Sequence, residues 1–128
     1  MRFANWVFLI AGIYGVLIVT PLFFSETRMG QDYPPPVNHP EWYYGFAGAA
    51  FSWQLMYLLI AWDVVRYRAI MLLGAAAKSA FLIAMIMLYL DERVAGGMVA
   101  LATPDGVLAA FFIAAWLRTP GESMDARY

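Results

Sequence analysis

The sequence predicts an all-α integral membrane protein, a four-helix bundle formed by a single domain over residues 1–128 with both termini in the cytoplasm. Three observations support this fold class. Hydrophobic residues make up 63% of the chain and charged residues 13%, against roughly 25% charged in a typical soluble domain. A soluble protein of this length has too little interior to hide so much apolar side chain from water. The other two observations are four apolar runs of spanning length and the placement of arginine in the short connections.

Each apolar run is about 20 residues long, which is the length that a helix needs to cross a bilayer. We place the spans at residues 3–24, 42–62, 69–90 and 97–117. The first run is too long for the core of a signal peptide, so we interpret it as a retained helix. In the fourth run, Pro104 predicts either a kink or a late helix start with Thr103 as N-cap, because proline has no backbone donor.

The connections between the spans differ in composition. Residues 25–41 are long for a link between helices and contain three consecutive prolines, so we expect an extended, turn-rich external loop. Residues 63–68 predict a tight hairpin in which Asp63, Arg66 and Arg68 clamp the chain at the cytoplasmic membrane surface. Residues 119–128 form a polar C-terminal tail.

Arginine in the short connections predicts the orientation, because positively charged segments favour the cytoplasmic side. Arg28 and Arg93 fall on the predicted outer side, whereas five arginines fall on the other, namely Arg2, Arg66, Arg68, Arg118 and Arg127. An even number of spans also returns both termini to one side. The sequence therefore predicts a multi-pass protein of the cell membrane, which we interpret as a bacterial inner membrane, with membrane lipids as partners.

Polar side chains near the middle of the spans form a candidate ligand-binding site. At 1.5 Å per residue, Lys78 lies about 15 Å from the cytoplasmic end of its helix, and Gln54, Tyr14 and Asp105 lie at comparable depths on the other three. A charge there costs about 3 kcal/mol or more. We therefore expect Lys78 to pair with Asp105, with Gln54 and Tyr14 supplying further hydrogen bonds.

This polar layer either fixes the order of the helices or holds a ligand, and the sequence leaves both readings open. Small residues spaced four apart, such as Ala11 and Gly15, predict close packing between helices. If a ligand binds, Gly74, Ala75 and Gly106 are expected to leave unfilled volume near Lys78.

A second candidate site lies at the entrance to the second span. His39, Glu41, Trp42 and Tyr43 follow the prolines there, and Glu41 suits the positive end of a helix dipole. This outer rim is either a structural helix start or a lip that admits a ligand, with His39 as a titratable group.

Several functional classes are disfavoured by what the sequence lacks. Eight basic and nine acidic residues form no basic stripe, so we expect no nucleic-acid partner. No P-loop, zinc-protease or nucleophile-elbow motif occurs, and a chain with no cysteine and one histidine cannot build a thiolate or multi-histidine metal site. We therefore assign no catalytic residue, no metal and no cofactor, and we favour a non-catalytic protein over an enzyme.

The stretch Asn38-His39-Pro40-Glu41-Trp42-Tyr43-Tyr44-Gly45-Phe46, followed by Gln54 and residues 63–68, resembles small four-span bacterial membrane proteins without an assigned activity. The chain is also distantly similar to the EXPERA group of sterol-isomerase and sigma-2-receptor-like bundles and to DoxX-like proteins. These share four spans, cytoplasmic termini and a long first external loop. The resemblance implies a four-helix membrane bundle and, for the EXPERA group, sterol-type binding or isomerisation. Residues 49–52 here are Ala-Ala-Phe-Ser, where that group carries a carboxylate.

Three functions stay open at this point. The first is a multi-pass membrane protein without catalysis, either free-standing or as an accessory subunit of a larger membrane complex or a homo-oligomer. The second is a binder or carrier of an apolar lipid-, sterol- or quinone-like molecule at the midplane polar site. The third and least favoured is an EXPERA-like isomerase.

Overall fold

The computed structural model describes residues 2–121, and every regular element in that range is a helix. The apolar runs form the long helices, which are α1 (Phe3–Val19) extended by the 3₁₀ helix η1 (Thr20–Phe24), α3 (Pro40–Trp62), α4 (Arg68–Leu90) and α5 (Gly96–Arg118). All four are long and apolar enough to cross a membrane, α1 together with η1. The all-helical class is therefore confirmed. Residues 122–128 of the expected polar tail, with Arg127, lie outside the described residues.

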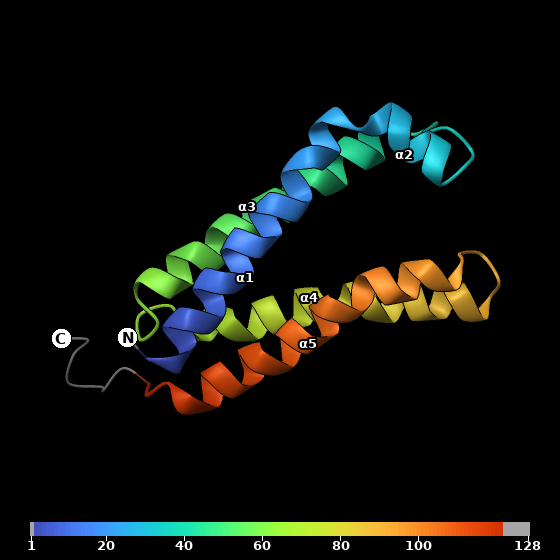
Figure 1. The fold of residues 1–128 in the computed structure, drawn as a ribbon. Helices are drawn as coiled ribbons and strands as arrows, with labels where there is room; N and C mark the ends of the chain where they lie inside the picture. Colours follow the sequence, from blue (N-terminus) through green and yellow to red (C-terminus); the bar gives the residue numbers. More distant parts are fainter. Residues whose placement is uncertain (1, 122–128) are drawn as a thin grey trace.

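The long helices form two antiparallel pairs, α1 with α3 and α4 with α5 (Figure 1). The two pairs meet at the end of the molecule where the N-terminus lies, and they separate toward the opposite end. Contacts between the pairs are made by α1 with α5 and by α3 with α4. We name the region between the separated ends of α3 (residues 40–45) and α4 (residues 82–90) the outer wedge.

The core lies at the end where the two helix pairs meet, which we name the shared end. All four long helices contribute buried side chains there. Phe8 of α1 stacks on Phe112 of α5 with the ring centroids 4.3 Å apart, and the ring of Tyr57 of α3 lies 4.9 Å from that of Phe112. Met71 of α4 and Ile60 of α3 are fully buried beside them. Interlocking of these large side chains determines which helix faces meet, since lipid offers no hydrophobic driving force between helices.

Residues 25–41 contain a further helix, α2 (Glu26–Asp32), so the expectation of an extended loop was wrong for this part. The prolines that suggested it begin at residue 34, after the helix has ended. Glu26 lies in the first turn, where the helix dipole favours negative charge, and Arg28 and Asp32 form an exposed i,i+4 pair at 3.4 Å. Tyr44 of α3 donates a hydrogen bond to Glu26 at 2.9 Å and so ties α2 to α3.

Helix α5 runs continuously through Pro104, so a late helix start at Thr103 was the wrong alternative. The Thr103 hydroxyl donates to the carbonyl of Val99 at 2.8 Å, one turn earlier, instead of capping a new helix. Proline has no N–H for the carbonyl of Ala100, which weakens the helix at this point. The ribbon of α5 bends in its middle part (Figure 1), in agreement with the other alternative, a kink.

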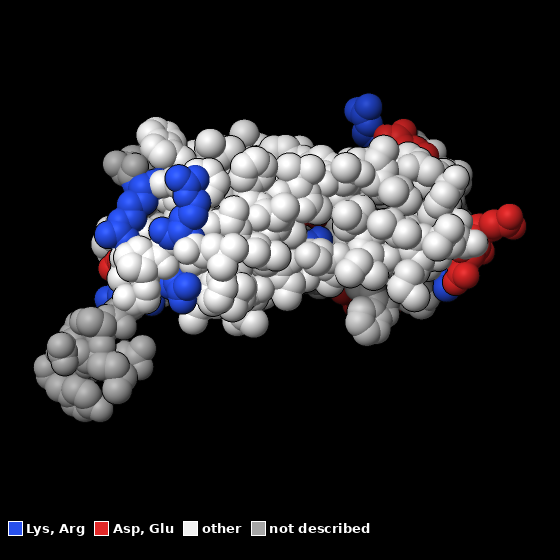
Figure 2. Space-filling model, turned by 90° about the horizontal axis from the view of Figure 1, so that it is seen from below, with Lys and Arg blue, Asp and Glu red and all other residues white. Residues whose placement is uncertain are grey.

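Charged side chains gather at the two ends of the molecule, and the surface between them is largely uncharged (Figure 2). Basic residues dominate the shared end and acidic residues dominate the end with the outer wedge. Among the described residues, the shared end carries Arg2, Asp63, Arg66, Arg68 and Arg118, and the opposite end carries Glu26, Arg28, Asp32, Glu41, Asp91, Glu92 and Arg93.

Candidate functional site

A buried ion pair joins the middle of α4 to the middle of α5. The ammonium nitrogen of Lys78 donates to Oδ1 of Asp105 at 3.1 Å, and the two side chains are 8% and 22% exposed. The helices are close here because Gly106 has no side chain, and a Cβ at that position would overlap Leu82. The expected pair between the two midplane charges is therefore present. It is a short ion pair that is shielded from the surroundings on most sides.

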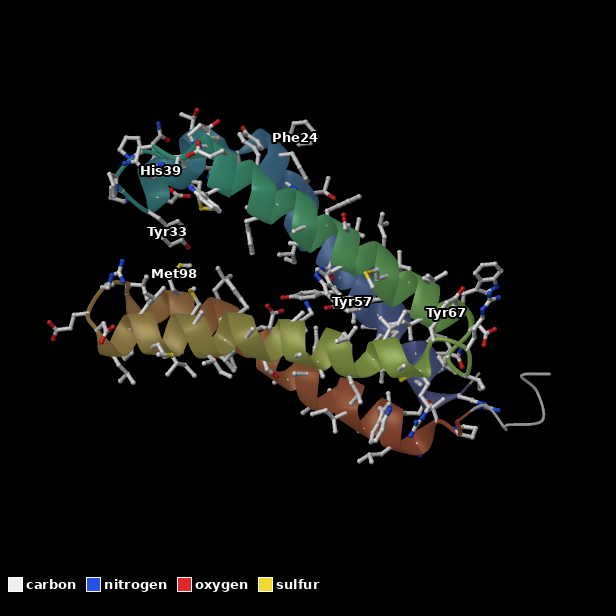
Figure 3. All side chains as sticks on the ribbon, turned by 180° about the vertical axis from the view of Figure 1, so that it is seen from behind. Phe24, Tyr33, His39, Tyr57, Tyr67 and Met98 are labelled. Carbon is white, nitrogen blue, oxygen red and sulfur yellow. The ribbon has the colours of Figure 1, made fainter. Side chains whose placement is uncertain are left out.

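Tyr57 of α3 completes the cluster from the other helix pair. The Lys78 ammonium nitrogen lies 5.4 Å from the centroid of its ring, which is within the range of a cation–π contact. Tyr57 is 1% exposed. A Cβ added at Gly74 of α4 would lie only 3.0 Å from Cε1 of the Tyr57 ring, so the ring packs closely against α4. Figure 3 shows Tyr57 pointing from α3 into the space between the pairs, where they begin to separate. This ring brings the second helix pair into contact with the ion pair.

Sequence reasoning missed Tyr57, because a tyrosine inside a span was counted as part of an apolar run. One signal was available. Tyr57 lies three residues after Gln54, and residues three apart share one region of a helix surface. A polar pair at that spacing in a span marks a face turned toward other helices rather than toward lipid.

The cluster has more hydrogen-bonding capacity than it uses. A lysine ammonium has three N–H donors, a carboxylate has two acceptor oxygens and a tyrosine hydroxyl can donate and accept. Within residues 2–121, one hydrogen bond joins these groups, from Lys78 to Asp105, and the Tyr57 hydroxyl has no hydrogen-bond partner. Two lysine donors, one carboxylate oxygen and one hydroxyl are therefore free for a small polar group. The ion pair itself carries no net charge.

Gln54 and Tyr14 do not join this cluster, although the sequence led us to expect them there. Gln54 turns toward α1, where its side chain lies over Gly15, and its Nε2 donates to the carbonyl of Ala50 at 2.8 Å. Tyr14 is 38% exposed on the surface of α1. The depth of each residue was estimated from the helix rise, but depth does not determine the direction in which a side chain points around its helix.

The small residues near Lys78 do not leave the volume that we expected. Gly74 packs against Tyr57 and Phe112, and Ala75 is 4% exposed within the core. Gly106 packs against Leu82, as described above. These residues bring helices together and leave little unfilled space beside Lys78.

An aromatic pair bridges α3 and α4 between this cluster and the outer wedge. Phe46 of α3 and Phe81 of α4 stack with centroids 6.1 Å apart and an angle of 26° between their planes. Phe81 lies three residues beyond Lys78, which is about 4.5 Å farther along α4. Phe46 remains 52% exposed despite this contact.

The outer rim lies at the far end of α3, away from the ion pair (Figure 3). Nδ1 of His39 lies 3.2 Å from Oε1 of Glu41, and both side chains are more than half exposed. Trp42 is 74% exposed, whereas the Tyr43 hydroxyl donates to the carbonyl of Leu22 at 2.6 Å and so holds η1 against α3. Tyr43 therefore has a structural contact, and the other three face outward.

Side-chain contacts of Asp63 and Arg68 hold the hairpin between α3 and α4. Oδ1 of Asp63 accepts a hydrogen bond from the backbone N–H of Arg66 at 3.1 Å, which closes the turn. Nε of Arg68 donates to the carbonyls of Trp116 at 3.2 Å and Thr119 at 2.7 Å, and its guanidinium lies 4.3 Å from the Trp116 ring centroid. Arg68 thereby satisfies carbonyls at the C-terminal end of α5, where positive charge is favoured.

No group of three histidine or acidic side chains in residues 2–121 is placed to hold a metal ion. The chemistry of the site is therefore that of a neutral ion pair, a tyrosine and their aromatic neighbours. No family model, no curated protein and no solved structure matches the chain.

Proposed function

We propose that the chain is a non-catalytic, multi-pass protein of the cell membrane that binds an amphiphilic molecule between its two helix pairs. The observation that carries this proposal is the free hydrogen-bonding capacity of Lys78, Asp105 and Tyr57 where the two helix pairs begin to separate (Figure 3). Polar groups without partners are costly in hydrocarbon, where no water competes for them. A molecule whose polar head reaches this cluster satisfies those groups while its apolar body stays in lipid-like surroundings.

The uneven distribution of charge supports an orientation for this protein. The shared end carries four of the described arginines and a single acid, whereas the end with the outer wedge carries five acids and two arginines (Figure 2). Basic residues favour the cytoplasmic side of a membrane. In this orientation both termini and the α3–α4 hairpin are cytoplasmic, the outer wedge opens toward the external leaflet, and the ligand enters from that leaflet.

The second candidate function is a structural or accessory subunit, free-standing or packed on a larger membrane complex or on another copy. It is favoured by the close packing at Gly74, Ala75 and Gly106, which leaves little room for a ligand beside the ion pair. A purely structural pair needs no ligand. The two functions therefore differ in whether a small molecule stays bound when the protein is extracted.

Native mass spectrometry of the protein released from nanodiscs tests the proposal. We expect the wild-type protein to retain an amphiphile, and we expect the double variant Lys78→Met/Asp105→Asn to lose it, because both polar partners are replaced by uncharged groups of similar size. The exposed pair Arg28 and Asp32 provides the control, since Arg28→Met/Asp32→Asn removes two charges far from the cluster. A wild-type protein with no bound small molecule would favour the structural subunit.

A further inference from the structure

We infer that the shared end of the molecule is a docking surface for an anionic phospholipid, whose phosphate group is bound by Arg68 and Arg118 beside the C-terminal end of α5. This inference does not depend on the Lys78–Asp105 cluster. It is carried by the excess of positive charge at the shared end, by the fixed positions of two arginines, and by the apolar surface next to them.

The shared end has more positive charge than its own carboxylates neutralise. Among the described residues it carries one acid, Asp63, and four arginines, which are Arg2, Arg66, Arg68 and Arg118 (Figure 2). Oδ1 of Asp63 accepts a hydrogen bond from the backbone N–H of Arg66. No ion pair within residues 2–121 involves any of these four guanidinium groups. The complementary partner for this surface is therefore negatively charged.

Two of the arginines are held in place beside the end of α5. Nε of Arg68 donates to the carbonyls of Trp116 and Thr119, and its guanidinium lies 4.3 Å from the Trp116 ring centroid. The Arg118 guanidinium lies 4.5 Å from the centroid of the Phe3 ring of α1. Within residues 2–121 the terminal nitrogens of both groups have no hydrogen-bond partner. They form the planar fork that binds phosphate oxygens, and a side chain already held in place loses less entropy on binding.

Apolar side chains that face outward lie next to both arginines, as the acyl chains of a phospholipid require. Leu72 lies one helical turn from Arg68 on α4 and is 41% exposed. On α5, Val107 and Phe111 share a face with Arg118 and are 51% and 46% exposed. A phospholipid matches both parts of this surface, because its phosphate meets the guanidinium groups and its chains cover the apolar side chains.

The net charge of the lipid is the property that this surface selects. Phosphatidylcholine and phosphatidylglycerol both carry a phosphodiester, but the choline ammonium of the former cancels the negative charge and is repelled by the arginines. Phosphatidylglycerol has no such cation. One arginine near an anionic membrane surface is worth about a fivefold change in affinity, so two arginines are sufficient to distinguish these lipids.

Native mass spectrometry of the full chain tests this inference. The protein is released from nanodiscs that contain equal amounts of phosphatidylglycerol and phosphatidylcholine with identical acyl chains. We expect the bound lipid to be enriched about fivefold or more in phosphatidylglycerol, and we expect Arg68→Gln/Arg118→Gln to abolish this enrichment. Arg118→Gln alone should lower it several-fold. The single variant keeps the bonds from Arg68 to α5, so it provides the test if a thermal melt shows that the double variant is unfolded.

The matched control is Arg28→Gln/Arg93→Gln, which removes the same number of positive charges at the opposite end of the molecule. The enrichment should persist in this control. It should also persist in Lys78→Met/Asp105→Asn, because the lipid surface is separate from the buried ion pair. Loss of enrichment in either of these variants, to the same extent as in Arg68→Gln/Arg118→Gln, would overturn the assignment.

The alternative occupant of the basic surface is the C-terminal segment of the chain, since residues 122–128 contain Glu122 and Asp125. We expect Glu122→Gln/Asp125→Asn to leave the phosphatidylglycerol enrichment unchanged. Enrichment that is seen only in this variant would assign the surface to the segment instead of a lipid. A wild-type protein without enrichment, or a folded Arg68→Gln/Arg118→Gln variant that retains it, would also overturn the inference.

Discussion

The side chain of Gln54 on α3 lies directly over the backbone of Gly15 on α1. The glutamine is 5% exposed, its Nε2 donates to the carbonyl of Ala50 at 2.8 Å, and its Oε1 has no hydrogen-bond partner among the described residues. The amide fits because Gly15 has no side chain, so the two helices approach closely at this point. Gln54 therefore packs against α1 without a hydrogen bond to it, whereas Lys78 and Asp105 bond α4 to α5.

Gly15→Ala is expected to destabilise the protein, because the added Cβ would overlap the amide of Gln54 and displace this buried side chain. Overpacking of this kind typically costs about 1–3 kcal/mol. Unfolding in mixed micelles of dodecylmaltoside and SDS measures the free energy. Gly48→Ala on α3 is the control, since a Cβ there meets nothing within 4 Å. That change should be neutral or slightly stabilising, and equal losses from both variants would contradict the close approach.

Asp105→Asn is expected to destabilise more than the double variant Lys78→Met/Asp105→Asn. The single change leaves a buried ammonium facing an uncharged partner, which typically costs about 3–5 kcal/mol in a fully buried pair, and less here because Asp105 is 22% exposed. The double change removes both charges. Asp32→Asn, in the exposed pair with Arg28, should cost less than about 1 kcal/mol. A double variant less stable than the single one would contradict this prediction, because it would show that Lys78 is tolerated without its charged partner.

Hydropathy and arginine placement were sufficient to predict the four long helices, because bilayer thickness sets the length of a spanning helix and lipid tolerates few charges. The same reasoning predicted the Lys78–Asp105 pair. An unpaired charge inside a membrane-spanning helix costs free energy, and the short turn between α4 and α5 brings the two helices side by side. It did not predict α2, because the three prolines at residues 34–36 disfavour a helix only at their own positions, after α2 has ended.

The membership of the polar cluster could be predicted only in part. Helix rise gives the depth of a side chain. The middle parts of the four long helices do carry the four expected residues, which are Lys78, Asp105, Gln54 and Tyr14. Which of them meet depends on rotation of each helix about its axis, and that rotation follows from packing of the large side chains in the core. Tyr57 faces Lys78 because its ring is held by Phe8 and Phe112, contacts that join residues far apart in the sequence.

Arg68→Lys is expected to lower stability by about 1–2 kcal/mol despite the conserved charge. Arginine donates from Nε to two carbonyls at the end of α5 and places its flat guanidinium on the Trp116 ring, and a lysine ammonium cannot reproduce that geometry. Hydrogen exchange at the C-terminal turn of α5 should quicken in the same variant. Arg66→Lys is the control, with an expected change below about 0.5 kcal/mol. Equal effects at both positions would indicate that charge alone matters.

Cysteine labelling tests the proposed orientation in intact cells, and the chain is suited to it because it contains no native cysteine. Arg28 on α2 and Arg66 in the α3–α4 hairpin lie at opposite ends of the molecule. Since basic residues favour the cytoplasm, we expect a membrane-impermeant maleimide to label Arg28→Cys in intact cells and Arg66→Cys only after the membrane is opened. Each variant removes one of the charges that support the orientation, so Thr27→Cys and Tyr67→Cys, which keep every arginine, serve as controls. Labelling of Thr27→Cys only in opened cells would reverse the orientation, and the outer wedge would then open to the cytoplasmic leaflet.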